Sequence, residues 1–498
     1  MKINPLNAID FYKTDHRRQY PEGTTQVYAN FTPRSGRLAK VLDSDDIQIV
    51  FFGLQYFIKD YLMDCWQENF FKLDKNKVVS AYKRRMDTSL GLDAISVQHI
   101  EALHDLGYLP LRIKALPEGS LIPIGIPVLT VVNTHPDFFW LTNYIESVMS
   151  CYLWKPITSA TTAFQYKKLM RHYAIKTGTS LDFIPFQCHD FSFRGLSGIQ
   201  DAIISGAGHL TSFCGTDTVL AIDLLENYYN ANAEQEIIGT SVPATEHSVM
   251  AMGMQEEELE TFRRLIEDLY PRGIISVVSD TWDFWKVITE YTVTLKDKIL
   301  ARDGKLVIRP DSGDPVKIIC GDASYPQNTP EYKGAIECLW EIFGGTITHQ
   351  GYKMLDSHMG LIYGDSITLD RAYNILKQLE MKGFASGNVV FGIGSYTYQY
   401  VTRDNFGFAM KATSGVVNGK RRDIFKNPKT DSGTKKSAKG LLRVEQENNT
   451  YILYEQQTPE EEKQGALEII FDNGKLVKDY RLADIRQRIN EKLIVNNE

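Results

Sequence analysis

The stretch KLVIRPDSGD (residues 305–314) begins with apolar, mostly β-branched residues and ends in a polar cluster. Five further stretches have the same form: FIPFQCHDFSFRG (183–195), HLTSFCGTDT (209–218), IISVVSDTWD (274–283), MGLIYGDSIT (359–368) and NVVFGIGSYT (388–397). Stretches with helical periodicity separate them. Strands whose polar residues gather at the carboxyl end, with helices between them, are typical of a (β/α) barrel-like domain with its active site at that end.

The polar residues at these predicted strand ends are too numerous to be structural caps alone. They are His189, Asp190, Arg194, Asp217, Asp280, Arg309, Asp311, Gly364, Asp365, Gly394 and Arg403. Guanidinium and imidazole groups next to carboxylates suit an anionic small molecule. We therefore expect an enzyme that acts on such a substrate.

Length and composition restrict the class of protein. A chain of 498 residues that is 43% hydrophobic is expected to form about two to four domains with real cores. Its net charge of −7 excludes non-specific nucleic-acid binding through a global basic field. The six cysteines are scattered without a CxxC pair, as expected of free thiols in a reducing compartment. Without an apolar leader or membrane-length run, we expect a soluble, intracellular protein of the cytoplasm.

The two ends of the chain predict a second domain. Residues 1–150 and 404–498 have a mixed α+β, largely antiparallel character, and they flank an α/β barrel-like domain of residues 151–403. Expected strands include TTQVYANFT (24–32) and ALEIIFDNGKLVKDY (466–480), the latter with a hairpin signal at residues 472–474. Expected helices cover residues 47–66, 140–180, 253–270 and 366–383, the last with Ser366 and Thr368 as candidate caps.

The most specific local motif is RPDSGDP (309–315). Arg309 and Asp311 are two residues apart at a strand end and therefore share one face. The guanidinium can bind phosphate oxygens while the carboxylate accepts ribose hydroxyls, although a salt bridge that caps the strand fits the same residues. Gly364-Asp365 has the form of a sugar-diol turn. FGIGSY (391–396) offers backbone N–H groups for one phosphate at a predicted helix start.

Three other features allow two interpretations each. His247, after Glu246 and before a predicted helix, is either a cap neighbour or a catalytic group. Phe191 and Phe193 beside Arg194 either pack in the core or stack on a flat heteroaromatic ring. The basic segment 420–440 is either a solvated loop or a cover for an anionic ligand.

Taken in order, these strings resemble the nicotinamide phosphoribosyltransferase family. The matching strings are HDFSFRG, GTDT, SVPATEHS, SVVSDTWD, IRPDSGDP, YGDS and TRD, together with DFYKTDHRRQYP near the start and NGKLVKDYRLADIR near the end. The resemblance implies a type II phosphoribosyltransferase fold. It also implies transfer of the phosphoribosyl group of 5-phosphoribosyl 1-diphosphate to nicotinamide, giving nicotinamide mononucleotide and diphosphate in NAD salvage. Mg²⁺, stimulation by ATP, and a homodimer with shared active sites are implied as well.

The resemblance assigns roles to residues of this chain. Phe191 is expected to stack on one face of nicotinamide, and Tyr12 of the partner subunit on the other. Asp217 is expected to accept the carboxamide N–H. His247 is expected to contact the diphosphate and to accept a phosphoryl group from ATP, with Asp280 as its partner. The other implied residues are Arg194 at the diphosphate, Arg309 and catalytic Asp311 along the ribose and base, Ser241 and Ser276 as further substrate contacts, Gly364 and Asp365 at the ribose, and Gly394, Ser395, Arg403, Lys411, Lys426 and the basic loop around Lys435 at phosphates.

The chain departs from the family pattern in its phosphate loop, where Ser395 and Tyr396 replace expected glycines, and at Ala409, where a serine is expected. A backbone cradle tolerates Ser395 if its φ stays negative. Three other functions are weighed against the implied one. An inert binding protein is disfavoured because Asp217, His247 and the RPDSGDP motif are present. An aldolase-type barrel lacks its strand-end lysine, and nicotinate as substrate is disfavoured by the charge of Asp217.

Overall fold

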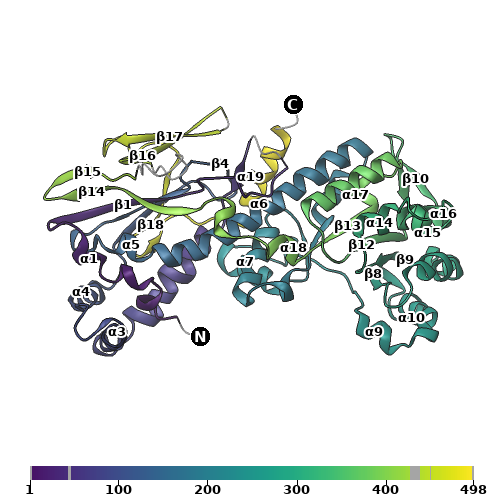
Figure 1. Ribbon diagram of the computed structural model, residues 1–498, viewed down its shortest axis with the longest axis horizontal. Coiled ribbons are helices and arrows are strands. Elements are labelled where there is room, and N and C mark those ends of the chain that lie inside the picture. Colours follow the sequence, from purple (N-terminus) through teal and green to yellow (C-terminus); the bar gives the residue numbers. More distant parts are fainter. Residues whose placement is uncertain (1–2, 43–45, 427–437, 449, 496–498) are drawn as a thin grey trace. The chain divides into compact units, whose positions relative to one another are not determined.

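The computed structural model describes residues 3–42, 46–426, 438–448 and 450–495 (Figure 1). The chain folds into two compact units. One comprises residues 1–161, 224–231 and 402–498, and the other residues 162–223 and 232–401. Part of the basic segment 420–440, including Lys435, lies outside the described residues. Among the residues that are described, no helix combines the length and apolar character needed to cross a membrane.

The first unit is organised around an antiparallel seven-stranded sheet with the order β15-β14-β1-β5-β3-β18-β19. Its strands are β1 (Thr24–Thr32), β3 (Leu111–Ala115), β5 (Leu129–Asn133), β14 (Ala409–Val417), β15 (Lys420–Asp423), β18 (Glu468–Asp472) and β19 (Lys475–Leu476). The long register between β1 and β14 joins the two chain ends, as Figure 1 shows. The sequence predicted this antiparallel character, and β1 coincides with TTQVYANFT.

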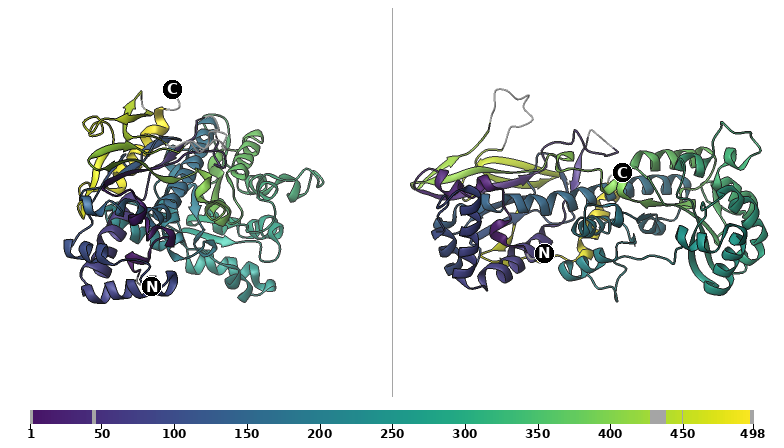
Figure 2. Two further views of the ribbon diagram at one scale, coloured as in Figure 1. Left: turned by 60° about the vertical axis from the view of Figure 1, so that its left-hand side comes forward. Right: turned by 60° about the horizontal axis from the view of Figure 1, so that its bottom comes forward.

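Shorter elements complete this unit. The strand pairs β2 (Gln48–Val50) with β4 (Leu121–Pro123), and β16 (Leu441–Glu447) with β17 (Thr450–Gln457), form separate two-stranded sheets. Its longer helices are α3 (Lys75–Leu90), α4 (Gln98–Leu106) and α19 (Leu482–Val495). Figure 2 shows the dark-blue helices of residues 54–106 on one side of the seven-stranded sheet. The predicted helix over residues 47–66 was wrong at its start, because Ile49 and Val50 pair with β4 instead.

The second unit contains a curled six-stranded parallel sheet with the order β7-β6-β13-β12-β9-β8. The strands are β6 (Cys188–Asp190), β7 (Gly215–Thr216), β8 (Arg272–Val278), β9 (Asp303–Arg309), β12 (Met359–Tyr363) and β13 (Val389–Ile393). One strand therefore arises from each of the six apolar stretches. The segment 240–244 forms single parallel bridges to both edge strands, at Gly215 of β7 and Ser276 of β8. This closure confirms the predicted barrel-like architecture.

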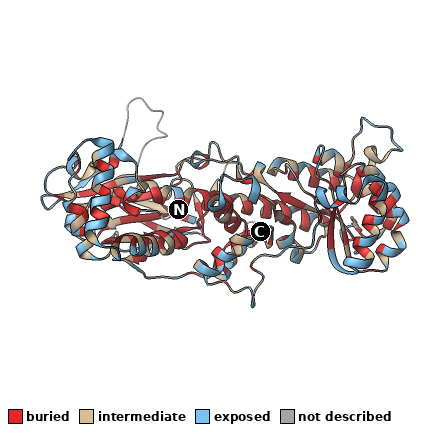
Figure 3. Ribbon diagram, turned by 90° about the horizontal axis from the view of Figure 1, so that it is seen from below, coloured by how far each residue is buried: buried red, intermediate tan, exposed pale blue. Residues whose placement is uncertain are grey.

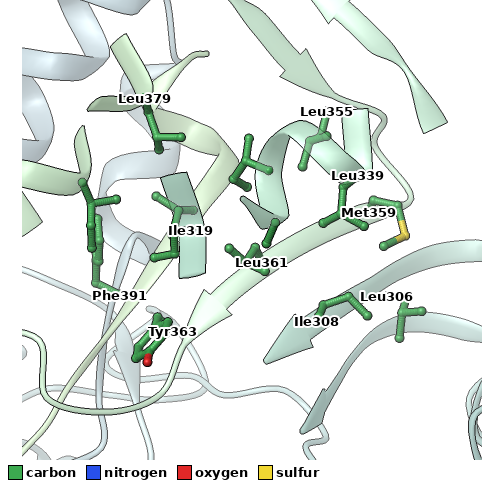
Figure 4. Close-up of a cluster of buried hydrophobic side chains, with 14 of the residues drawn as sticks. Leu306, Ile308, Ile319, Leu339, Leu355, Met359, Leu361, Tyr363, Leu379 and Phe391 are labelled. Atoms are coloured by element: carbon green, nitrogen blue, oxygen red, sulfur yellow. The ribbon is translucent and has the colours of Figure 1, made fainter. Parts of the chain in front are cut away.

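Helices cover the outer face of this parallel sheet. They include α7 (Ile199–His209), α10 (Glu258–Arg264), α14 (Pro315–Cys320), α16 (Ala335–Phe343) and α17 (Leu369–Met381). Helix α8 (Val219–Tyr229) begins in this unit, and its residues from Leu224 onward belong to the first unit. Leu306, Ile308 and Leu361 of the sheet are buried in one cluster with Leu339 of α16 and Leu379 of α17 (Figure 4). Figure 3 shows that the strands of both units are mostly buried.

Two helices test the predictions made from periodicity. Helix α6 (Glu146–Thr177) confirms most of the stretch predicted over residues 140–180. Helix α17 ends two residues before Gly383, whose φ is +77°, and its side-chain cap is Thr368, which accepts from the backbone N–H of Arg371. Ser366 is not the cap, because it has a left-handed φ of +54° in the turn before the helix.

Candidate active site

The predicted polar residues gather where the parallel strands end. Asp217 follows β7, Asp280 follows β8, Asp311 follows β9, Asp365 follows β12 and Gly394 follows β13. Because neighbouring parallel strands end at the same edge of a sheet, their following loops lie together. The apolar strands thus bring together carboxylates that are far apart in the sequence.

Asp217 is held by two neighbours on the same edge. Its Oδ1 lies 2.9 Å from Nε2 of His189 and accepts from the hydroxyl of Ser241 at 2.7 Å. Burial raises the pKa of Asp217, but the contacts with His189 and Ser241 outweigh it and the pKa lies below the ordinary value. The His189 ring is 4.7 Å from that of Phe191 between centroids. The ionised carboxylate of Asp217 is thus connected through His189 to the aromatic ring of Phe191.

A second group of polar residues surrounds Asp280. Its Oδ2 accepts from the backbone N–H of Asp311 at 2.9 Å, and from the N–H and hydroxyl of Ser312 at 2.7 and 2.5 Å. Its buried Oδ1 has no hydrogen-bond partner among the described residues and lies 4.0 Å from Nε2 of His247. His247 begins helix α9 (His247–Met252), so the prediction that it stands at a helix start is confirmed.

Both ring nitrogens of His247 have a polar neighbour. Its Nδ1 lies 3.1 Å from the hydroxyl of Thr281, and its Nε2 lies 3.7 Å from Oδ2 of Asp311. Burial raises the pKa of Asp311; Arg309 and His247 oppose this shift, whereas Asp280 and Asp365 add to it. The side chain of His247 is half-exposed, so its ring is oriented by polar neighbours and remains accessible to a ligand.

Arg309 links these two groups. Its Nη2 donates to the backbone carbonyl of Thr245 at 2.5 Å, while its buried Nε has no partner among the described residues. The carboxyls of Asp217 and Asp311 each have a pKa that burial raises and the charge of Arg309 lowers. The guanidinium is thus bonded to Thr245, and no ion pair between Arg309 and Asp311 is found among the described residues, so the interpretation as a strand-capping salt bridge is not supported.

Glycines allow close approach in this site. A Cβ placed on Gly364 would lie 1.8 Å from Oδ1 of Asp311, so the carboxylate lies directly over the glycine backbone. A Cβ on Gly195 would lie 2.7 Å from Cβ of Ser395. Ser395 therefore fits the phosphate loop because its neighbour is a glycine, and its φ is not positive, as expected.

The other predicted residues of this unit occupy different environments. Gly394 precedes the short helix α18 (Ser395–Tyr398) and has open space beside its Cα. Arg194 and Asp365 are exposed. Ser276, on β8, is buried, and its hydroxyl has no partner among the described residues. A buried hydroxyl without a partner needs an explanation, and an ordered water or a bound ligand would supply the missing hydrogen bond.

The first unit contains four of the predicted residues, Tyr12, Arg403, Lys411 and Lys426. Tyr12 is 65% exposed, and an aromatic ring this accessible has little role in its own core. Arg403, Lys411 and Lys426 are all exposed, and Lys411 lies on β14.

Two further cations near Lys411 were missed from the sequence. Burial lowers the pKa of Lys411, Glu146 raises it, and Arg34 and Lys13 lower it further. Lys13 forms an ion pair of 2.7 Å with Glu146. Its position next to Tyr12 in DFYKTD is a signal that could have identified it, whereas Arg34 is separated from Lys411 by most of the chain.

No protein-only metal cage is present in the described part of the chain, where no group of three or more His, Cys, Asp or Glu side chains is arranged to hold an ion. Mg²⁺ commonly binds to one or two carboxylates and to substrate phosphates instead. The free Oδ1 of Asp280 and the mutually repelling carboxyls around Asp311 fit that mode of binding.

Comparisons with known proteins agree with this geometry. Residues 186–472 match the nicotinate phosphoribosyltransferase (NAPRTase) family, and residues 4–113 match the N-terminal domain of nicotinamide phosphoribosyltransferase. The chain is 63% identical to a nicotinamide phosphoribosyltransferase of Acinetobacter baylyi, over 99% of this chain and 98% of the relative. It is 35% identical to one of Mycoplasma pneumoniae, over 88% and 95%.

Two solved structures share the fold at 14% identity. A nicotinate-nucleotide pyrophosphorylase from Pyrococcus furiosus aligns with a TM-score of 0.60 over 99% of this chain and 97% of its own. The human nicotinic acid phosphoribosyltransferase aligns with a TM-score of 0.55 over 97% and 93%. At 14% identity these structures show the fold alone. The two relatives at 63% and 35% identity show the family. The chain therefore belongs to the NAPRTase family, among its nicotinamide phosphoribosyltransferases.

Proposed function

We propose that this protein transfers the phosphoribosyl group of 5-phosphoribosyl 1-diphosphate to nicotinamide, giving nicotinamide mononucleotide and diphosphate in NAD salvage. The observation that carries this proposal is the carboxylate of Asp217. Its Oδ1 is held by His189 and Ser241, its pKa is low, and its side chain is 47% exposed. Such a group accepts a carboxamide N–H and repels a carboxylate, which favours nicotinamide over nicotinate.

The bond changes define what the site has to stabilise. The bond between the ribose anomeric carbon and the diphosphate oxygen breaks, and the pyridine nitrogen bonds to the same carbon. Negative charge grows on the departing diphosphate while positive charge passes through the ribose to the pyridine ring. Arg194, Arg309 and His247 supply donors for the diphosphate, and Asp311 supplies a carboxylate near the cationic centre. Ser276 and Ser241 add hydroxyls beside the ring.

Phosphate and ribose contacts complete the assignment. Gly364 and Asp365 suit the ribose hydroxyls, because the glycine lets the carboxylate of Asp311 lie against its backbone, beside the exposed side chain of Asp365. Gly394 and Ser395 suit the 5′-phosphate. Arg403, Lys411 and Lys426 of the first unit are assigned to phosphates as well, on the family resemblance. Mg²⁺ would bind to the carboxylates of Asp280 and Asp311 and to diphosphate oxygens, and it would supply positive charge to the leaving group.

ATP and a second subunit are part of the same proposal. His247 accepts the γ-phosphoryl group: the bond between γ-phosphorus and the bridging oxygen breaks, a phosphorus–nitrogen bond forms, and ADP leaves. Asp280 is the neighbouring carboxylate that stabilises the imidazole. Tyr12 of the partner subunit stacks on nicotinamide opposite Phe191 in a cytoplasmic homodimer. The six free cysteines agree with a reducing compartment.

The test is product formation by the purified protein with 5-phosphoribosyl 1-diphosphate and Mg²⁺, using nicotinamide or nicotinate at equal concentration. We expect nicotinamide mononucleotide and diphosphate in equal amounts, with a large preference for nicotinamide in kcat/KM. A preference for nicotinate would contradict the assigned substrate, and the absence of product from either would contradict the reaction itself.

A further inference from the structure

Asp190 is a fully buried carboxylate that the proposed mechanism does not use. It ends strand β6, and its side chain has no exposed surface. Both oxygens are nevertheless occupied. Oδ1 accepts from the backbone N–H of Ser192 at 2.9 Å and from its hydroxyl at 2.6 Å. Oδ2 accepts from the hydroxyls of Thr218 at 2.7 Å and Thr216 at 3.2 Å.

These contacts connect two loops of the site. Ser192 belongs to the loop that follows β6, and it comes directly after Phe191. Thr216, the last residue of β7, and Thr218, in the loop that follows it, are the residues on either side of Asp217. The backbone N–H of Asp217 also donates to the backbone carbonyl of Asp190 at 2.9 Å. One carboxylate thus holds the neighbours of both proposed nicotinamide contacts.

Further contacts make this arrangement rigid. The backbone N–H of Thr218 donates to the hydroxyl of Thr216 at 2.9 Å, and this local hydrogen bond fixes the turn at Asp217. A Cβ on Gly206 of α7 would lie 3.2 Å from Oδ2 of Asp190, so the helix backbone packs close to the carboxylate. Because all these groups are buried, water cannot replace a lost contact at low cost.

We propose that Asp190 is a positioning residue that sets the spacing between the ring of Phe191 and the carboxylate of Asp217, and thereby the affinity and selectivity for nicotinamide. The aromatic ring must lie against one face of the pyridine while the carboxylate meets the carboxamide at its edge. A small change in the separation of the two loops therefore weakens both contacts together. This inference rests on the proposed function, since it takes both residues as contacts of the ring substrate.

Single donors of the network can be removed with little change in shape. Thr218→Val removes the hydroxyl that donates to Oδ2, and Ser192→Ala removes the one that donates to Oδ1. Thr211→Val is the matched control, because Thr211 is also fully buried in the same unit and its hydroxyl donates at 2.7 Å to the carbonyl of Gly208, outside this network. Melting temperatures of the three variants show whether their losses of stability are comparable.

We expect Thr218→Val and Ser192→Ala to raise the KM for nicotinamide roughly tenfold each, the equivalent of one hydrogen bond to a charged group. Their preference for nicotinamide over nicotinate should fall, whereas the KM for 5-phosphoribosyl 1-diphosphate should not change. Thr211→Val should leave both KM values unchanged. In an Asp190→Asn background, Thr218→Val should add little, because the charged acceptor is already gone.

Three results would overturn the inference. One is an unchanged KM for nicotinamide in both network variants. Another is an equal rise in both substrate KM values, which indicates general loosening of the fold. The third is full additivity of Thr218→Val with Asp190→Asn. Failure of the proposed function is distinguishable, because it would be seen in the wild-type protein as use of another ring substrate, before any variant is compared.

Discussion

Replacement of Asp217 by asparagine should shift the ring-substrate selectivity of the enzyme from nicotinamide towards nicotinate. Oδ1 is engaged by His189 and Ser241, and Oδ2 has no hydrogen-bond partner among the described residues. We therefore expect Oδ2 to meet the carboxamide of nicotinamide. Asparagine keeps the shape of the side chain but removes its charge, and its amide group can donate to a carboxylate. Asp217→Asn should bind nicotinamide less well and admit nicotinate.

The size of the effect follows from the contacts. A hydrogen bond to a charged acceptor contributes about 1.5–3 kcal/mol, which corresponds to a loss of roughly 10- to 150-fold in kcat/KM for nicotinamide. Two carboxylates about 4 Å apart repel by about 4 kcal/mol near a protein surface. Because the Asp217 side chain is 47% exposed, solvent screens part of this repulsion. We therefore expect a gain for nicotinate of about 1–3 kcal/mol, or roughly 5- to 150-fold.

The assay is paired measurement of kcat/KM for the two ring substrates at saturating 5-phosphoribosyl 1-diphosphate. Asp223→Asn is the matched control, because this exposed aspartate of α8 lies in the same unit and the substitution changes the charge equally. The control should keep the wild-type ratio. The same ratio in Asp217→Asn as in wild type would refute the role of this carboxylate in amide recognition.

Four other outcomes follow from the site. His247→Ala should abolish stimulation by ATP and lower basal turnover about 10²–10³-fold; retained stimulation in coupled assays would exclude His247 as the phosphoryl acceptor. Mixing Tyr12→Ala and Asp311→Ala chains, each inactive alone, should restore activity in mixed dimers, and no recovery despite subunit exchange would contradict a shared site. Gly364→Ala should strongly lower kcat/KM with little change in Tm, since its Cβ would displace the carboxylate of Asp311; wild-type kinetics would disprove the close approach. Because burial raises the pKa of Asp311, the rate should fall with decreasing pH through that raised pKa; a variant Asp311→Asn that keeps the same acid limb in its pH–rate profile would show that another group titrates.

Much of the secondary structure could be predicted because the signals are local. Alternation over TTQVYANFT predicted β1, and the hairpin signal at residues 472–474 predicted the turn between β18 and β19, where Asn473 and Gly474 both have positive φ. Strand ends with polar clusters predicted which loops lie together at one edge of the parallel sheet. The prediction failed where pairing overrides periodicity, as at Gln48–Val50, which the partner strand β4 makes extended.

The sequence by itself determined which residues carry charge and which ends of which strands they follow. Only the tertiary structure decided their partners. His189 and Ser241 lie 28 and 24 residues from Asp217, and three of the charges that act on Lys411, those of Lys13, Arg34 and Glu146, come from the N-terminal part of the chain. Asp190 looked like one more polar strand end, yet it is buried beneath two loops. Such contacts depend on which strands become neighbours in a sheet, and that choice is made by packing over the whole chain and not by any local pattern.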